Sequence, residues 1–124
     1  MEQGEIRLQR ECLGSMISVT LHFSGRDLNV VIAGGDKEHI GSVSIAAPRE
    51  SLSGEGKSAT VSTYVYSGHK DDVVGNEFAQ VLCKKLQCKV VVCCGIHYDN
   101  IDQEKLNMIV NTCNELLINV MKRI

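Results

Sequence analysis

The stretch that decides the fold is Lys89-Val90-Val91-Val92-Cys93-Cys94, which continues as Gly95-Ile96-His97-Tyr98-Asp99-Asn100. Five small or β-favouring apolar residues follow the lysine, and patterns typical of helices lie on both sides of them. Such a run predicts a strand that is covered on both faces and is therefore central in its sheet. The glycine ends the strand, and a histidine, a tyrosine and a carboxylate follow within three positions.

Two further loops resemble the one that begins at Gly95. They read Gly34-Gly35-Asp36-Lys37-Glu38-His39-Ile40-Gly41 and Ser67-Gly68-His69-Lys70-Asp71-Asp72. Three of the four histidines therefore lie in loops that also contain glycine and aspartate, which makes these loops the first place to look for a site.

Length and composition describe an ordinary globular chain. Its 124 residues, 44% hydrophobic and 23% charged, are enough to bury a core without disulfides, so we expect one domain over residues 1–124. A net charge of -2 gives no reason to expect nucleic acid as a partner. The sequence has no apolar run of membrane-spanning length and no basic-then-apolar start, so we expect no membrane association.

The six cysteines lack the spacing of zinc or redox motifs, and most lie among apolar residues. They predict free thiols in a reducing cytoplasm.

Hydrophobic periodicity predicts the elements in order. Alternation favours strands over residues 5–12, 17–23, 28–33, 40–46 and 59–66, with the second and third paired as a hairpin and the first at an edge of the sheet. We expect a loop over residues 34–38 and a mobile surface loop over residues 47–57, which holds the single proline. An amphipathic stripe predicts a helix from about Lys70, and a second helix should begin after an N-cap at Asp102 and end near Arg123. The fold class is therefore α+β, a mainly antiparallel sheet of about six strands with two flanking helices in the order β-β-β-β-β-α-β-α.

The directions of the strands predict that the three loops meet. Strands joined by short loops pair antiparallel, whereas a strand-helix-strand connection returns parallel. The strands that precede Gly34, Gly68 and Gly95 should therefore run the same way, so that their loops leave the sheet at one edge.

Several chemistries fit these loops from the residues alone. The loop at Gly68 opens a helix, whose free N–H groups and nearby lysines attract phosphate, although acidic residues in a first turn also complement the helix dipole without any ligand. His39, His69 and His97 could bind a metal or could each hold a turn rigid. His97 with Asp99, or His69 with Asp72, could form an acid/base pair. Tyr66 and Tyr98 could flank a planar ligand or simply pack with the hydroxyl in water.

The three loops together resemble the signature loops of the small prenylated-flavin chaperone-like proteins, which include the D subunit of hydroxyarylic acid (gallate-type) decarboxylases. The resemblance runs from about residue 16 to the C-terminus and is carried by Gly34-Gly35-Asp36-Lys37-x-His39-Ile40-Gly41, Gly68-His69-Lys70-Asp71-Asp72 and Gly95-Ile96-His97-x-Asp99-x-Ile101. This chain departs from the family in Cys93-Cys94 and in a longer C-terminal helix.

The resemblance implies a fold related to the proteasome assembly chaperones and a soluble, homodimeric accessory protein without chemistry of its own. It also implies that the protein helps a decarboxylase client acquire or keep prenylated FMN, or FMN, with no metal. The candidate cofactor-binding residues carried over from the loops are Gly35, Asp36, Lys37, His39, Gly68, His69, Lys70, Asp71, His97 and Asp99. Two alternatives stay open: a small metal-assisted or acid/base enzyme using His39, His69 and His97, and an assembly chaperone for a protein complex.

Overall fold

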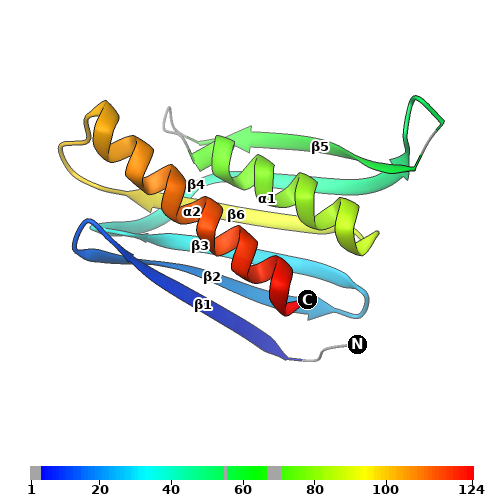
Figure 1. The fold of residues 1–124 in the computed structure, drawn as a ribbon, viewed down its shortest axis with the longest axis horizontal. Helices are drawn as coiled ribbons and strands as arrows, with labels where there is room; N and C mark the ends of the chain where they lie inside the picture. The colour runs from blue at the N-terminus through cyan, green and yellow to red at the C-terminus, as the bar shows by residue number, and fades with distance from the viewer. Residues whose placement is uncertain (1–3, 55, 67–70) are drawn as a thin grey trace.

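The computed structural model describes residues 4–54, 56–66 and 71–124, which form one six-stranded sheet with two helices (Figure 1). The elements along the chain are β1 (Glu5–Cys12), β2 (Ser15–Ser24), β3 (Asp27–Gly35), β4 (Lys37–Glu50), β5 (Lys57–Val65), α1 (Asp71–Leu86), β6 (Val90–His97) and α2 (Gln103–Arg123). The predicted α+β class and order of elements are confirmed.

The strands are ordered β1-β2-β3-β6-β4-β5 across the sheet. Strand β6 is therefore central and β1 lies at an edge, as predicted. The hairpin of β2 with β3 is antiparallel, β3 pairs parallel with β6, and β4 pairs antiparallel with both β6 and β5. Strands β3, β5 and β6 thus run the same way, and their C-terminal ends lie at one edge of the sheet, which confirms the predicted directions.

Both helices pack through apolar stripes. On α1 the side chains of Val74, Phe78 and Leu82 are buried, and on α2 those of Ile109, Cys113, Leu116, Leu117 and Val120 are buried. The predicted cap of α2 is confirmed, because the carboxylate of Asp102 accepts the Lys105 N–H at 2.8 Å. Within the described residues, neither helix combines the length and the apolar character that crossing a membrane would require.

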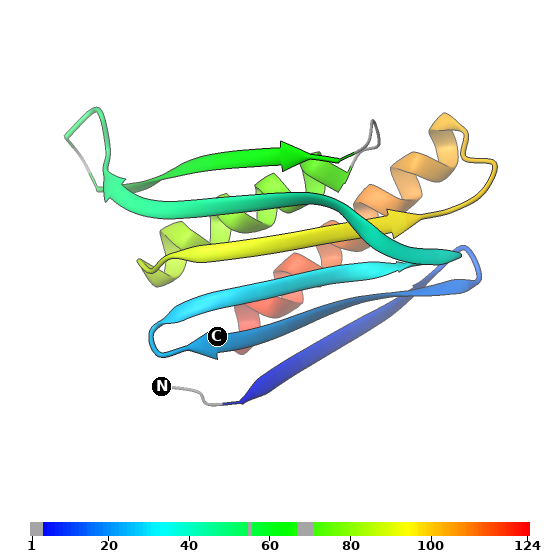
Figure 2. The ribbon, with the colours of Figure 1, turned by 180° about the vertical axis from the view of Figure 1, so that it is seen from behind.

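The two helices cover the same face of the sheet, and the view from behind shows that no helix of the described residues covers the opposite face, here called the bare face, although β4 crosses over the end of β6 there (Figure 2). The prediction that the stretch after Lys89 is covered on both faces is therefore wrong. Val90, Val92 and Cys94 point to the helices and are buried, but Val91 on the other face is 36% exposed. The apolar run reflects two apolar faces, of which the described chain covers one.

Strand β4 is longer at both ends than its alternation predicted. Only Asp36 separates it from β3, so the expected loop over residues 34–38 is a tight turn. At the other end β4 continues through Pro48 to Glu50, and the expected loop over residues 47–57 shrinks accordingly. Pairing with β6 stops at Ala46, whereas pairing with β5 continues through Pro48. The proline is tolerated because β4 there has a neighbour on one side only.

The inward face of β4 is polar and small. Ser42 and Ser44 are buried beneath α1, where a Cβ added to Gly75 would lie 3.4 Å from both hydroxyl oxygens, while Val43 and Ile45 point to the bare face. Ser44 hydrogen-bonds Thr63 on β5 at 2.9 Å. Small side chains on both elements let α1 lie close to the sheet.

Candidate functional site

The candidate site is the edge of the sheet where β3, β5 and β6 end. The turn at Asp36, the start of α1 at Asp71 and the segment from His97 to Asp99 meet there. Gly68, His69 and Lys70 of the predicted site lie outside the described residues. The seven other candidates are described, and all of them lie at this edge, in β3, β4, β6 or α1 or within two residues of the end of one of these elements.

Asp36 joins the first and third loops. Its backbone N–H donates to the carbonyl of His97 at 2.6 Å, and its Oδ2 accepts the N–H of Asp99 at 3.0 Å. Its Oδ1 accepts the hydroxyl of Ser15 at 3.2 Å, so the turn between β1 and β2 is held as well. Both carboxylate oxygens therefore serve as acceptors within the fold.

Two histidines stand side by side at this edge. The ring centroids of His39 and His97 are 6.2 Å apart, with the ring planes nearly perpendicular at 89°. Nε2 of His97 lies 3.0 Å from Oδ1 of Asp99, which is the predicted histidine–aspartate pair. About a third of each imidazole side chain is exposed, so both rings are within reach of a ligand from solution.

Asp71 is the buried member of the site. It is the first residue of α1, only 5% exposed, and its Oδ1 accepts the N–H of Ile96 at 3.0 Å. Its Oδ2 lies 3.3 Å from Nε2 of His39. This carboxylate therefore links α1 to β6 and to β4, a role that goes beyond complementing the helix dipole.

Glycines allow the three loops to approach so closely. A Cβ on Gly95 would overlap the carbonyl oxygen of His39, and a Cβ on Gly41 would overlap the carboxylate of Asp71. A Cβ on Gly35 would likewise overlap the carbonyl of His97. Strand β4 is irregular here, because its register with β6 shifts between Glu38 and Ser42. This irregularity brings His39 over the end of β6.

The two tyrosines named from the sequence behave differently. Tyr98 is 6% exposed and its hydroxyl donates to the carbonyl of Cys12 at 2.6 Å, so it neither faces a ligand nor places its hydroxyl in water. Burial raises its pKa well above the ordinary range, with the hydrogen bond to Cys12 adding to the shift. Tyr66, by contrast, is 64% exposed and its ring lies 5.0 Å from that of Tyr64.

The remaining described candidate, Lys37, lies opposite His97 in the pairing of β4 with β6 and is exposed. Together with the two imidazoles it forms a set of N–H donors at one edge. The carboxylate oxygens nearest the rings face them, because Oδ2 of Asp71 lies 3.3 Å from Nε2 of His39 and Oδ1 of Asp99 lies 3.0 Å from Nε2 of His97. Lys37 adds an exposed positive charge to this edge.

The structure does not strengthen the metal hypothesis. In residues 4–54, 56–66 and 71–124, no group of three histidine, cysteine or acidic side chains is arranged to hold a metal ion. His39 and His97 are neighbours, but the third histidine of the proposed trio, His69, lies outside the described residues. For the acid/base alternative, the pair His97–Asp99 places a carboxylate oxygen 3.0 Å from Nε2 of the imidazole, which is the arrangement of a general base oriented by an aspartate.

Sequence reasoning missed two contributors to this edge. Ser15 was not among the candidate residues, although its hydroxyl donates a hydrogen bond to Asp36. The internal role of Asp71 was also missed, because an aspartate in a first helical turn carries the same sequence signal whether it faces water or the sheet. Gly41 in the first loop was the available signal for this role, because a Cβ at that position would overlap the carboxylate of Asp71.

Comparisons with known proteins agree with this architecture. Residues 11–124 match the family model of the prenylated flavin chaperone LpdD-like domain. No curated protein matches the chain. Among solved structures, a chain of a novel chaperone complex for yeast 20S proteasome assembly is similar, with 11% identity and a TM-score of 0.50 over 93% of this chain and 99% of that one. At that identity the likeness concerns the fold alone.

Proposed function

The chain belongs to the prenylated flavin chaperone LpdD-like family, and from that premise we propose that it is a non-catalytic accessory protein for a prenylated-flavin-dependent decarboxylase. It helps this client acquire or keep its flavin. The observation that carries the proposal is that the described signature residues, far apart in sequence, meet at one sheet edge and leave two imidazoles and a lysine accessible.

The chemistry of the edge fits a flavin phosphate. Lys37 offers an ammonium group to the phosphate oxygens beside the partly exposed imidazoles of His39 and His97, while Asp36 and Asp71 position the loops from within. The exposed ring of Tyr66, whose N–H donates to the carbonyl of Gly41 at 2.8 Å, offers an apolar face for a planar ring system. The prenylated flavin supplies the decarboxylation chemistry when it is bound in the client, so this chain needs only to bind it.

Direct binding of FMN tests the proposal. We expect purified protein to quench FMN fluorescence in a saturable titration, and Lys37→Ala to weaken binding about tenfold, because a charge-assisted hydrogen bond is worth roughly 1.5 kcal/mol or more. The matched control is Lys84→Ala, because Lys84 is an exposed lysine at the far end of α1. Equal affinities for the two variants, or no saturable binding up to about 1 mM FMN, would contradict direct flavin binding.

The partners follow from the same premise. The family implies a client protein, and we assign this client to the decarboxylase that uses the flavin. Co-purification of the chain with that decarboxylase, and a lower flavin content of the client in cells that lack the chain, are the expected results. We further propose a homodimer in the cytoplasm, where its six free thiols remain reduced.

A further inference from the structure

The two edge strands of the sheet differ in composition. The charged residues of β1 are Glu5, Arg7, Arg10 and Glu11. Arg10 is also tied to Glu115 of α2 by an ion pair at 2.8 Å. Charged side chains of this kind keep an edge strand from pairing with another chain. Strand β5 forms the other edge, and residues 58–66 contain no charged residue, no proline and no glycine. Charge therefore opposes strand addition at β1 and does not oppose it at β5.

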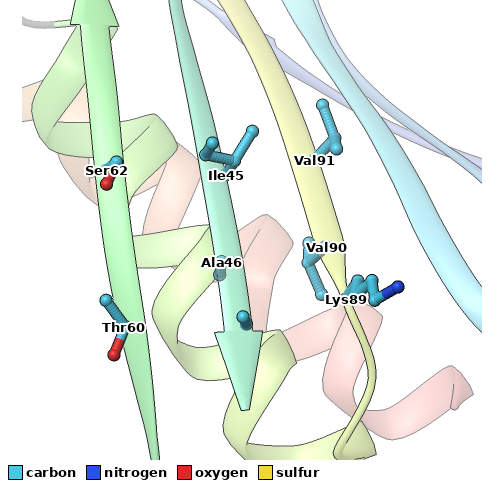
Figure 3. Close-up of a pocket in the computed structure, with 8 residues that line it drawn as sticks. Ile45, Ala46, Thr60, Ser62, Lys89, Val90 and Val91 are labelled. Carbon is cyan, nitrogen blue, oxygen red and sulfur yellow. The ribbon is translucent and has the colours of Figure 1, made fainter.

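Strand β5 is also straight and open on one side. Its register with β4 runs without a shift over nine residue pairs, so it lacks the bulge that often blunts a sheet edge. Among residues 4–54, 56–66 and 71–124, no strand lies beyond it (Figure 1, Figure 2). Figure 3 shows part of this strand at a hollow of about 340 Å³, where Thr60 and Ser62 stand on β5 beside Ile45 of β4. The far side of β5 is therefore accessible to an added strand.

The hydrogen bonds between β4 and β5 determine which backbone groups face outward. The N–H of Tyr66 donates to the carbonyl of Gly41 at 2.8 Å, so the backbone of Tyr66 faces β4. Successive residues of a strand face opposite sides, so every second residue before Tyr66 also faces β4. Pro48 agrees with this assignment, because it lies opposite Ala59 and has no N–H to donate. The residues whose N–H and C=O groups point away from β4 are therefore Ala59, Val61, Thr63 and Val65.

We infer that β5 receives an extended segment of the client protein as an added strand of the sheet. A row of outward N–H and C=O groups is complemented by the backbone of another extended chain, and these main-chain bonds supply the affinity. The side chains of β5 define which segment fits. Val61 and Val65 stand on the helix side, whereas Thr60, Ser62 and Tyr64 stand on the bare face. The matching segment alternates β-branched apolar residues with hydroxyl-bearing residues and has no charge opposite them.

The direction of β5 connects this edge strand to the candidate site. Strand β5 runs the same way as β3 and β6, so it ends at the sheet edge where the site lies. Tyr66, directly after β5, bonds to Gly41, and a Cβ on Gly41 would overlap the carboxylate of Asp71. A segment on β5 therefore lies beside the residues proposed to hold the flavin phosphate, which a client that takes up the flavin must approach. The identity of the partner rests on the proposed function, whereas the open edge does not.

A defined peptide tests the edge without any flavin. The probe is Thr-Val-Thr-Val-Thr-Val-Thr, with a fluorescent label and a short ethylene glycol tail for solubility. In an anisotropy titration we expect saturable binding with a Kd of about 100 μM. Val61→Pro should weaken binding at least about tenfold, because it removes an outward N–H and no bond to β4. Val61→Thr is the matched control, since it keeps both the N–H and the branched shape, and it should bind like the unmodified chain.

A second variant keeps the test decisive if Val61→Pro does not fold, which far-UV circular dichroism reports. Val65→Lys changes a residue that is 41% exposed and places a charge on the edge, so it should also weaken binding at least about tenfold. No saturable binding up to about 1 mM peptide, or equal affinities of the folded edge variants and Val61→Thr, overturns the inference.

Amide hydrogen exchange shows where the peptide binds. With peptide, the N–H groups of Val61 and Thr63 should exchange at least about tenfold more slowly, whereas those of Ser62 and Tyr64, which already face β4, should not change. Protection without this alternation overturns the inference. Protection that rises with protein concentration alone assigns the edge to a second copy and overturns the client segment. An FMN titration separates the two proposals, because peptide binding without FMN binding contradicts only the flavin role, and the reverse result contradicts only the added strand.

Discussion

The buried carboxylate of Asp71 makes the sharpest prediction about how the site is built. Asp71 and Asp72 are adjacent in the first turn of α1, and both would complement the helix dipole equally in a free helix. In the fold, Asp71 is 5% exposed and accepts the N–H of Ile96, while Asp72 is half-buried. Comparing Asp71→Ala with Asp72→Ala therefore separates the stability that the internal hydrogen bond contributes from the stability that the helix dipole contributes.

The magnitude follows from the contacts that are lost. Asp71→Ala leaves the N–H of Ile96 buried without its acceptor, which costs about 1 to 3 kcal/mol, and removes the attraction to His39. We expect a total loss of about 3 kcal/mol in the free energy of unfolding. With an unfolding entropy of roughly 2.1 cal/mol/K per residue, this lowers Tm by roughly 10 °C. Asp72→Ala should cost about 0.5 kcal/mol, or roughly 2 °C, through the dipole alone.

Urea unfolding followed by far-UV circular dichroism measures both losses, and differential scanning calorimetry checks the Tm. The m-value should be unchanged, since neither substitution alters the surface exposed on unfolding. Losses that are equal within about 0.5 kcal/mol would refute the internal role of Asp71. So would a loss below about 1 kcal/mol for Asp71→Ala, because an orphaned buried N–H cannot cost so little.

Further predictions concern close packing, a buried hydroxyl and a buried thiol. Gly95→Ala should destabilise by about 3 kcal/mol because its Cβ would overlap a backbone carbonyl of β4, whereas Gly75→Ala, with ordinary contacts in α1, should be neutral or stabilising in the same urea assay. Tyr98→Phe should cost about 1 kcal/mol in urea unfolding by removing a buried hydrogen bond to the end of β1, and no loss would contradict that bond. Burial raises the pKa of Cys113 from about 9 to about 12, so the unfolded chain loses this proton first as the pH rises. Stability should therefore fall above pH 9, by about 1.4 kcal/mol at pH 10 from this thiol, and Cys113→Ala should show a shallower decline from pH 8 to 10.

Much of the fold followed from periodicity and turn chemistry. The alternation over residues 17–23 and 28–33 predicted the β2–β3 hairpin, and the capping carboxylate of Asp102 predicted where α2 begins. Strand directions also followed, because short loops and helix crossovers leave few choices. The convergence of Asp36, His97 and Asp99 was predictable for that reason alone.

The details of the site could not be read in the same way. The register shift in β4 that brings His39 over the end of β6 depends on the close approach of backbones, which alternation does not report. The internal use of Asp71 depends on the orientation of one side chain. Sequence patterns define which residues reach an edge, but the partner of each polar atom is decided by tertiary packing.

The one wrong conclusion about the central strand has a physical explanation. The run after Lys89 predicted a strand covered on both faces, yet Val91 and Cys93 point to the bare face. An apolar residue is selected by what covers it, whether the cover comes from the same chain or from another. Periodicity therefore reports that both faces of the strand are apolar, and it does not report which of them the chain itself covers.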